Sequence, residues 1–129
     1  MIDHIGFAVR DAETSRIFYE TALAPLGISL IMSATPDQTA SGGTAHGFGK
    51  DGKPFLWVAD KETVGEGTHV ALAVETRAMV HAFHAAALQA GGRDNGAPGP
   101  RPHYGPHYYA AFVLDPDGNN IETVCWADA

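Results

Sequence analysis

Residues 69–92 read HVALAVETRAMVHAFHAAALQAGG, and they align without a gap on residues 4–27, HIGFAVRDAETSRIFYETALAPLG, at a constant offset of 65. Seven of the 24 aligned positions are identical, including the pairs His4/His69, Phe18/Phe83 and Gly27/Gly92. Each copy starts with alternating bulky and small residues, as in a half-buried strand, and continues with the apolar spacing of a helix that glycine ends. We interpret the alignment as a tandem duplication of one structural unit.

The segments around the two copies predict a similar order of elements in each half of the chain. In the first half we expect a strand, a helix and three further strands, at residues 2–10, 12–24, 28–33, 44–48 and 54–59. In the second half we expect a strand that begins at residue 68 and a helix at residues 76–90. A loop at residues 93–106, with at most one short, irregular strand, and a hairpin at residues 107–126 follow. The chain is therefore predicted to be one domain with an α+β fold, built from two tandem βαβββ units at about 1–62 and 67–127.

The hairpin at residues 107–126, HYYAAFVLDPDGNNIETVCW, carries a single carboxylate in its second strand, Glu122. At the turn, Asp115 can bond back to the backbone, Pro116 fixes φ at the second position and Gly118 suits the fourth, which favours a type I turn. Aromatic and β-branched residues on both sides of the turn favour extended chain. Glu122 is thus expected among apolar neighbours, where a carboxylate needs an explanation.

Strand alternation predicts that three candidate metal ligands face the same side. Bulky residues of the two repeated strands must cover the helices, which leaves His4 and His69 on the opposite face beside small residues. Glu122 shares its face of the hairpin with Asn120 and Val124. Two histidines and one carboxylate suit a divalent metal with open coordination positions, and Fe2+, Mn2+, Zn2+, Ni2+ and Co2+ all remain open. Taken singly, each histidine could instead be an ordinary strand residue, and Glu122 a solvated acid.

Composition limits the partners of the chain. Its 129 residues carry a formal net charge of -7, and the eight Lys and Arg residues are scattered singly, so we expect no nucleic-acid partner. The single cysteine, Cys125, cannot form an internal disulfide. The first residues form only a short apolar run, and charged residues soon interrupt it, so we expect neither a signal peptide nor a membrane span there. We therefore expect a cytoplasmic protein with no membrane association.

Two βαβββ units, the first opening with His4 and Ile5 and the last closing with DPDGNNIE at residues 115–122, resemble the vicinal oxygen chelate superfamily. That superfamily contains glyoxalase I, extradiol dioxygenases, fosfomycin-thiol transferases, methylmalonyl-CoA epimerases and bleomycin-binding proteins. The resemblance implies a curved mixed sheet around a cleft, closed either within one chain or across a homodimer. It also implies metal ligands at the positions of His4, His69 and Glu122.

One ligand position of the superfamily is missing from this chain. Members with four ligands take a second carboxylate from the last strand of the first unit, where this sequence has Leu56 or Trp57. Glyoxalase I uses that acid both as a ligand and as a base. Because this acid is absent, the chain resembles more closely the members with three ligands. These are the iron(II) extradiol dioxygenases and the manganese-dependent fosfomycin-thiol transferases.

Residues near the expected ligands supply candidate catalytic and substrate-binding groups. Tyr109 could donate a proton or a hydrogen bond to a metal-bound oxyanion, and His103 or His107 could shuttle a proton. Phe55 and Trp57 could form an apolar wall for the substrate. Tyr109, Phe55 and Trp57 would each also be at home as packed core residues.

We therefore expect a metal-dependent enzyme that acts on a small oxygen-bearing molecule, with Glu122 and Tyr109 at the centre of its chemistry. Glyoxalase-like lyase or isomerase chemistry and extradiol ring opening are both open. Two alternatives remain: a thiol transferase of the fosfomycin type, and a non-catalytic, drug-sequestering protein of the bleomycin-resistance type. An acidic chain is compatible with the second, because it would attract a cationic drug.

Overall fold

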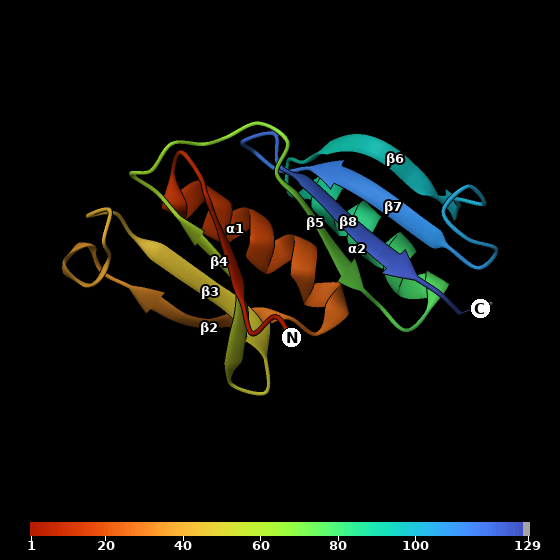
Figure 1. Ribbon diagram of the computed structural model, residues 1–129, viewed down its shortest axis with the longest axis horizontal. Helices are drawn as coiled ribbons and strands as arrows, with labels where there is room; N and C mark the ends of the chain where they lie inside the picture. Colours follow the sequence, from red (N-terminus) through yellow and green to blue (C-terminus); the bar gives the residue numbers. More distant parts are fainter. Residues whose placement is uncertain (128–129) are drawn as a thin grey trace.

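The computed structural model describes residues 1–127, which form two strand–helix–three-strand units (Figure 1). The first unit consists of β1 (Ile5–Ala8), α1 (Ala12–Leu23), the 3₁₀ turn η1 (Ala24–Leu26), β2 (Ser29–Ala34), the 3₁₀ turn η2 (Pro36–Gln38), β3 (Ala45–Lys50) and β4 (Lys53–Ala59). The second consists of β5 (His69–Ala73), α2 (Arg77–Gln89), β6 (Arg93–Pro100), β7 (Tyr109–Leu114) and β8 (Asn120–Cys125). The α+β fold predicted from the internal repeat is confirmed.

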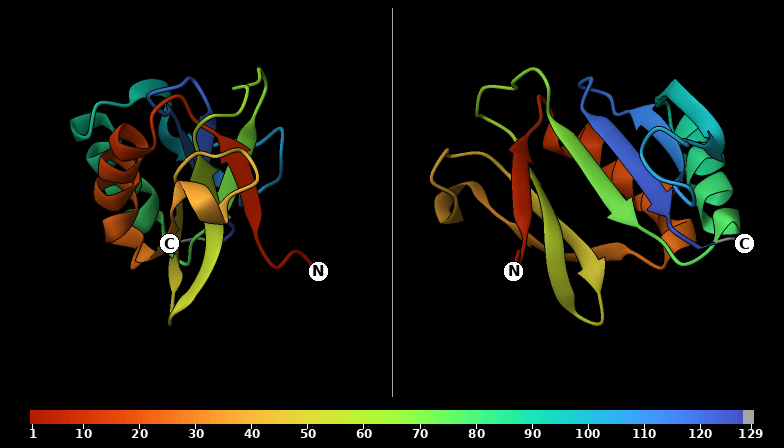
Figure 2. Two further views of the ribbon diagram at one scale, coloured as in Figure 1. Left: turned by 90° about the vertical axis from the view of Figure 1, so that its left-hand side faces the viewer. Right: turned by 45° about the vertical axis from the view of Figure 1, so that its right-hand side comes forward.

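Each unit forms its own four-stranded mixed sheet. The strand orders are β1-β4-β3-β2 and β5-β8-β7-β6, and the repeated strands β1 and β5 pair in parallel with β4 and β8. Both repeated strands are therefore sheet edges, with one partner strand each among the described residues. A side view shows α1 and α2 in one layer and the strands in the other, so the helices leave the opposite face of both sheets uncovered (Figure 2).

The core lies between the helices and the sheets, and both units contribute to it. Helix α1 contacts α2 directly. One cluster of buried side chains crosses this contact, and its members include Val9, Phe18, Tyr19, Phe83, Val113 and Ile121. The bulky residues of the repeated strands pack against the same cluster, as their alternation predicted: Ile5, Phe7, Val70, Leu72 and Val74. This cluster contains residues of both units, so the two units share a hydrophobic core.

Both helices begin at side-chain caps. The Asp11 carboxylate accepts a hydrogen bond from the Thr14 amide at 2.9 Å, and the Thr76 hydroxyl accepts one from the Met79 amide at 3.2 Å. Gly27 has a φ of 73°, a left-handed conformation that glycine adopts at little cost and that ends the first helical segment. No helix of the described chain is long and apolar enough to span a bilayer.

The segment after α2 forms one irregular strand, as predicted, but this strand is longer than expected. It is β6, which runs over Arg93–Pro100, and its pairing with β7 shifts register twice. Proline and glycine cause the shifts, because proline lacks an amide donor and glycine accepts bulged backbone. A loop at residues 101–108 then leads into β7, which starts at Tyr109, later than the predicted hairpin start.

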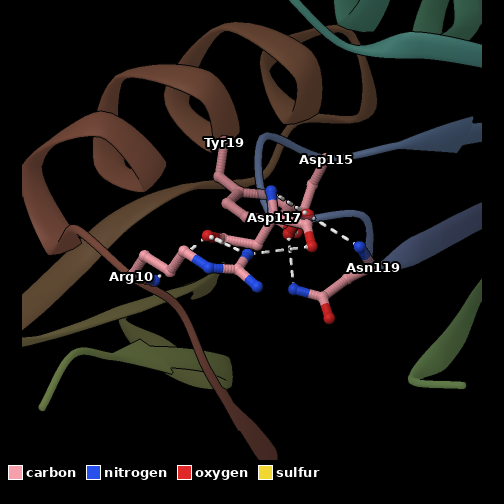
Figure 3. Close-up of polar contacts among 5 residues, drawn as sticks. All are labelled: Arg10, Tyr19, Asp115, Asp117 and Asn119. Carbon is pink, nitrogen blue, oxygen red and sulfur yellow. Dashed lines mark hydrogen bonds and ion pairs between the residues drawn. The ribbon is translucent and has the colours of Figure 1, made fainter. Parts of the chain in front are cut away.

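A buried hydrogen-bond cluster attaches the hairpin turn of the second unit to α1 of the first (Figure 3). Asp115 is 2% exposed, and its carboxylate accepts bonds from the Tyr19 hydroxyl at 2.6 Å and from the Asn119 side-chain amide at 2.8 Å. The backbone amides of Asp117 and Asn119 donate two more, at 2.9 and 2.8 Å. The amide of Arg10 donates to the Asp117 carboxylate at 3.1 Å. The predicted turn, closed by Gly118 N donating to the Asp115 carbonyl at 3.0 Å, therefore also fixes the two units together.

Candidate metal centre

The structure brings two of the three predicted ligands together on the helix-free face of the second sheet. Parallel pairing places His69 opposite Asn120 and Ala71 opposite Glu122, so His69 and Glu122 point to the same side. The distance from His69 Nε2 to Glu122 Oε1 is 2.8 Å. Glu122 is 1% exposed, whereas about half of the His69 side chain (47%) reaches solvent. The carboxylate is thus the floor of the site and the imidazole is its accessible edge.

The second oxygen of this carboxylate is held by a tyrosine that the sequence analysis did not select. The Tyr108 hydroxyl donates a short hydrogen bond to Glu122 Oε2. Burial, followed by this bond and the charge of Glu122, raises the pKa of Tyr108 to about 12. Tyr108 is therefore protonated near neutral pH and acts as a hydrogen-bond donor. It precedes β7, so strand alternation could not assign its direction.

Tyr109, the predicted catalytic tyrosine, lies on the opposite face of the sheet. It pairs with Cys125 in the register of β7 and β8, and its hydroxyl bonds the His81 ring of α2 at 2.6 Å. The Arg77 guanidinium lies 4.6 Å from the centre of the Tyr109 ring. The structure thus corrects the sequence expectation: the tyrosine at Glu122 is Tyr108, and Tyr109 packs against α2.

His4 is not brought to this pair within one chain. It lies just before β1, its Nδ1 is 2.7 Å from the Asp3 carboxylate, and its side chain is 59% exposed. Across residues 1–127, no three side chains of the His, Cys, Asp and Glu types gather closely enough to hold an ion. The predicted ligand set is therefore split between the two sheets.

Phe55 and Trp57, the predicted apolar wall, do not act as one surface. Trp57 pairs with Gly6 and Gly47 on the face that helix α1 does not cover. A Cβ atom added at Gly47 would lie 2.8 Å from the Trp57 ring, so glycine is needed for the indole to lie flat there. The β3–β4 register skips Phe55, which packs against the core cluster instead. Phe55 thus takes the alternative role of a packed core residue, and the bulge turns its side chain to that side.

A cavity of about 280 Å³ opens above the carboxylate. It is lined by His69, Tyr104, Tyr108, Phe112 and Glu122. Its walls are thus aromatic and its polar groups are few, which is the usual composition of a small-molecule site. His107 is exposed and is not among the residues that line the cavity, and His103 lines a neighbouring one.

The donor types of this pair, an imidazole nitrogen and a carboxylate oxygen, fit a divalent metal ion. Two ligands at about 2.1 Å from a tetrahedral ion lie about 3.4 Å apart, so His69 Nε2 and Glu122 Oε1, hydrogen-bonded at 2.8 Å, would have to move apart slightly to bind one. Glu122 is almost fully buried, and among the described residues its one ion-pair partner is His69. A carboxylate buried without a permanent cation is costly, and a bound cation would offset that cost.

Solved structures of similar fold cover nearly the whole chain. A glyoxalase/bleomycin resistance protein from Albidiferax ferrireducens T118 is 26% identical with a TM-score of 0.73, and the match covers 95% of each chain. Glyoxalase I from Zea mays is 25% identical with a TM-score of 0.69, and the match covers 96% of this chain but 45% of the maize enzyme. This chain therefore spans about half the length of that enzyme.

A glyoxylase/bleomycin resistance protein/dioxygenase domain from Frankia sp. EAN1pec has a TM-score of 0.74 at 14% identity, which supports the fold alone. No curated protein sequence matches significantly. Residues 1–123 match the family described as the Glyoxalase/Bleomycin resistance protein/Dioxygenase superfamily. Because the match covers nearly the whole chain, this protein belongs to that superfamily.

Proposed function

We propose that the protein is a divalent-metal-dependent enzyme that acts on a small oxygen-bearing substrate in the cavity above Glu122. The observation that carries this proposal is the buried Glu122 carboxylate, which has His69 on one oxygen and Tyr108 on the other. Imidazole and carboxylate are among the usual ligands of divalent metals, and an aromatic cavity with few polar groups is typical of a small-molecule site. The free, buried Cys125 suits a reducing compartment, and we include a cytoplasmic location in the proposal.

The residues of the site have distinct roles in this proposal. His69 Nε2 and Glu122 Oε1 hold the ion, while Tyr108 fixes the carboxylate by occupying its other oxygen. When bound, the ion would supply Lewis-acid stabilisation of negative charge on a substrate oxygen. Phe112 and Tyr104 line the cavity and would contact an apolar part of the substrate.

A third protein ligand would come from His4 of the partner subunit in a homodimer. Two features support this. His4 is exposed on a different sheet from His69 and Glu122, and strands β1 and β5 are both sheet edges whose second side has no partner in the described chain. An exposed edge strand is a natural docking surface for another copy. A shared site would give each ion two histidines and one carboxylate.

The lack of a second carboxylate limits the reaction. Leu56 is fully buried on the helix side of β4, and Trp57 carries no metal-binding group, so the first unit supplies no acid at that position. The chemistry is then carried by Glu122, His69 and Tyr108. Glyoxalase-like lyase or isomerase activity, extradiol ring opening and thiol transfer to an epoxide form the set to be screened, with Mn2+, Fe2+, Zn2+, Ni2+ and Co2+ in turn.

Metal titration of the purified, chelator-treated protein tests the proposal. We expect His69→Ala and Glu122→Gln each to weaken binding of Zn2+ or Ni2+ at least a hundredfold, beyond the range of about 10–100-fold for loss of an outer partner. His84→Ala is the matched control, because His84 bonds Asp94 away from the cavity. Equal metal affinity in wild type, His69→Ala and Glu122→Gln would remove the metal site.

A non-catalytic binding protein is the second candidate. The separation of His4 from the other two ligands within one chain favours it, because two protein ligands alone hold a divalent ion weakly. In that case the cavity would bind its small molecule equally well with and without added metal. Calorimetry of a bound ligand in chelator and in each metal separates the two candidates.

A further inference from the structure

A second cavity, of about 310 Å³, adjoins the one above Glu122. The two cavities share Tyr104 and Phe112 as lining residues. The polar residues that line the second cavity are Asn95, Arg101, His103 and Asn120. A ligand that extends from the first cavity into the second along Phe112 would therefore meet the Arg101 cation and two side-chain amides.

Arg101 is held in place by backbone carbonyls. Its Nη1 donates to the Gly99 carbonyl at 2.8 Å and its Nη2 to the Ala97 carbonyl at 2.7 Å. The guanidinium carbon lies 5.4 Å from the centre of the Phe112 ring, within the range of a cation–π contact. Gly96 allows this approach, since a Cβ there would lie 2.9 Å from the Phe112 ring and 3.2 Å from Arg101 Nη2. The cation is thus fixed before any ligand arrives.

Among the described residues Arg101 has no ion-pair partner, a feature that it shares with Arg77 and Arg93 but not with Arg10 and Arg16. Arg10 pairs with Asp117 and Arg16 pairs with Glu13 and Glu20, whereas no carboxylate of residues 1–127 lies within ion-pair distance of Arg101. The backbone carbonyls occupy only some of its five N–H donors. In a chain of net charge -7, an uncompensated and oriented guanidinium indicates a binding site for an anion.

We propose that the second cavity binds the carboxylate of the substrate through Arg101, so that the substrate is a small monocarboxylic acid with a planar portion along Phe112. The inference rests on the proposed function only in taking the Glu122 end as the reacting end. One guanidinium balances one negative charge, which favours a carboxylate over a doubly charged phosphate. Asn95, whose amide donates to the Asn120 side chain at 3.2 Å, flanks the same end of the cavity. The flat guanidinium and the Phe112 ring favour an unsaturated or aromatic acid over a branched one.

Titration of metal-free, isotope-labelled protein with benzoate and with benzamide tests this proposal by amide chemical shifts. We expect benzoate to bind about tenfold or more tightly than benzamide, since a hydrogen bond to a charged group is the stronger kind. The shifts should centre on Gly96, Phe112 and Asn120. Arg101→Gln should abolish the preference and Arg101→Lys should reduce it, because lysine keeps the charge but loses the fork. Arg93→Gln is the control, because Arg93 is an exposed arginine at the other end of β6.

Three results would overturn the proposal. These are equal affinity for benzoate and benzamide, a preference that survives Arg101→Gln in a protein with an otherwise unchanged spectrum, and shifts confined to residues outside the cavity. Tighter binding of phenyl phosphate than of benzoate would overturn the choice of a carboxylate. Because the titration contains no metal, its outcome is independent of the metal titration. A protein that binds no metal but prefers benzoate through Arg101 keeps the anion site and loses the proposed function.

Discussion

The Tyr19 hydroxyl makes a bond that joins the two units, and its removal measures that link. Tyr19 is fully buried on α1, and its hydroxyl donates to Asp115 Oδ2 at 2.6 Å in the turn between β7 and β8. Burial, followed by the charge of Asp115, raises the pKa of Tyr19 well above its ordinary value, so the hydroxyl is a donor at every ordinary pH. Tyr19→Phe removes this donor and leaves the ring in place.

The expected cost follows from the charge of the acceptor. A hydrogen bond to a charged group contributes about 1.5–3 kcal/mol, and the Asp115 carboxylate keeps its three other donors in the variant. With an unfolding entropy of about 2.1 cal/mol/K per residue, 129 residues give about 270 cal/mol/K. A loss of 1.5–3 kcal/mol then lowers Tm by about 6–11 °C.

Thermal and urea unfolding of Tyr19→Phe and Tyr104→Phe check this expectation. Tyr104 is 57% exposed, and we expect its substitution to change stability by less than about 0.5 kcal/mol. The two variants lose the same atom in opposite environments. If Tyr19→Phe is no less stable than Tyr104→Phe, the buried cluster does not hold the two units together and our reading of the hairpin turn is wrong.

Three further predictions concern the site and the first sheet. Tyr108→Phe should weaken metal binding about tenfold by freeing one Glu122 oxygen, whereas Tyr109→Phe, on the other face, should not; equal effects in a metal titration would contradict the assignment. Burial, and then the positive charge of Arg16, lowers the pKa of His46. The contribution of neutral His46 to the free energy of unfolding is therefore complete above its unfolded-state pKa of about 6.5 and falls as the pH drops below that value. In urea unfolding, the pH dependence of the free energy of unfolding should be weaker in His46→Gln, and an unchanged pH dependence would refute this. Gly47→Ala places a Cβ 2.8 Å from the neighbouring indole and should cost about 1–3 kcal/mol, with a change in tryptophan fluorescence; an unaltered spectrum and midpoint would count against the close contact.

The fold could be predicted because the same pattern of a strand followed by a helix occurs twice in the sequence. Alternation in the two aligned strands assigned the core face correctly, from Ile5 in β1 to Val74 after β5. The apolar spacing of the two helices and the glycines that follow them predicted the helix ends to within a few residues. These features are local, so one sequence is enough to read them.

Errors arose where the backbone departs from regular alternation. Phe55 is at a bulge, so its side chain packs in the core, and only Trp57 of the two wall candidates lies on the open face. Tyr108 precedes β7 in an irregular loop, and only tertiary structure brings its hydroxyl to Glu122. Tyr109, one residue later, is in the strand and was given a role at the Glu122 face that its register does not allow.

The separation of the ligands also lay beyond the sequence. Strand alternation correctly indicated that the side chains of His69 and Glu122 point to the same face, because the two residues lie in paired strands of one sheet. The position of His4 depends on how the two sheets are arranged, and alternation within a strand carries no information about that arrangement. Arg101 was overlooked for a related reason: its loop gave no regular pattern, and its unpaired charge is visible only in three dimensions.

Complementation between two inactive variants tests most directly whether His4 of the partner subunit joins His69 and Glu122 at one ion. Each of His4→Ala and Glu122→Gln, purified alone, should bind little metal, since every site of either homodimer lacks a ligand. When the two are co-expressed with different tags and the mixed dimer is isolated, one site per dimer has its full ligand set. We predict that the mixed dimer binds one tightly held divalent ion, half the wild-type content. A mixed dimer as empty as its two parents would contradict the shared site.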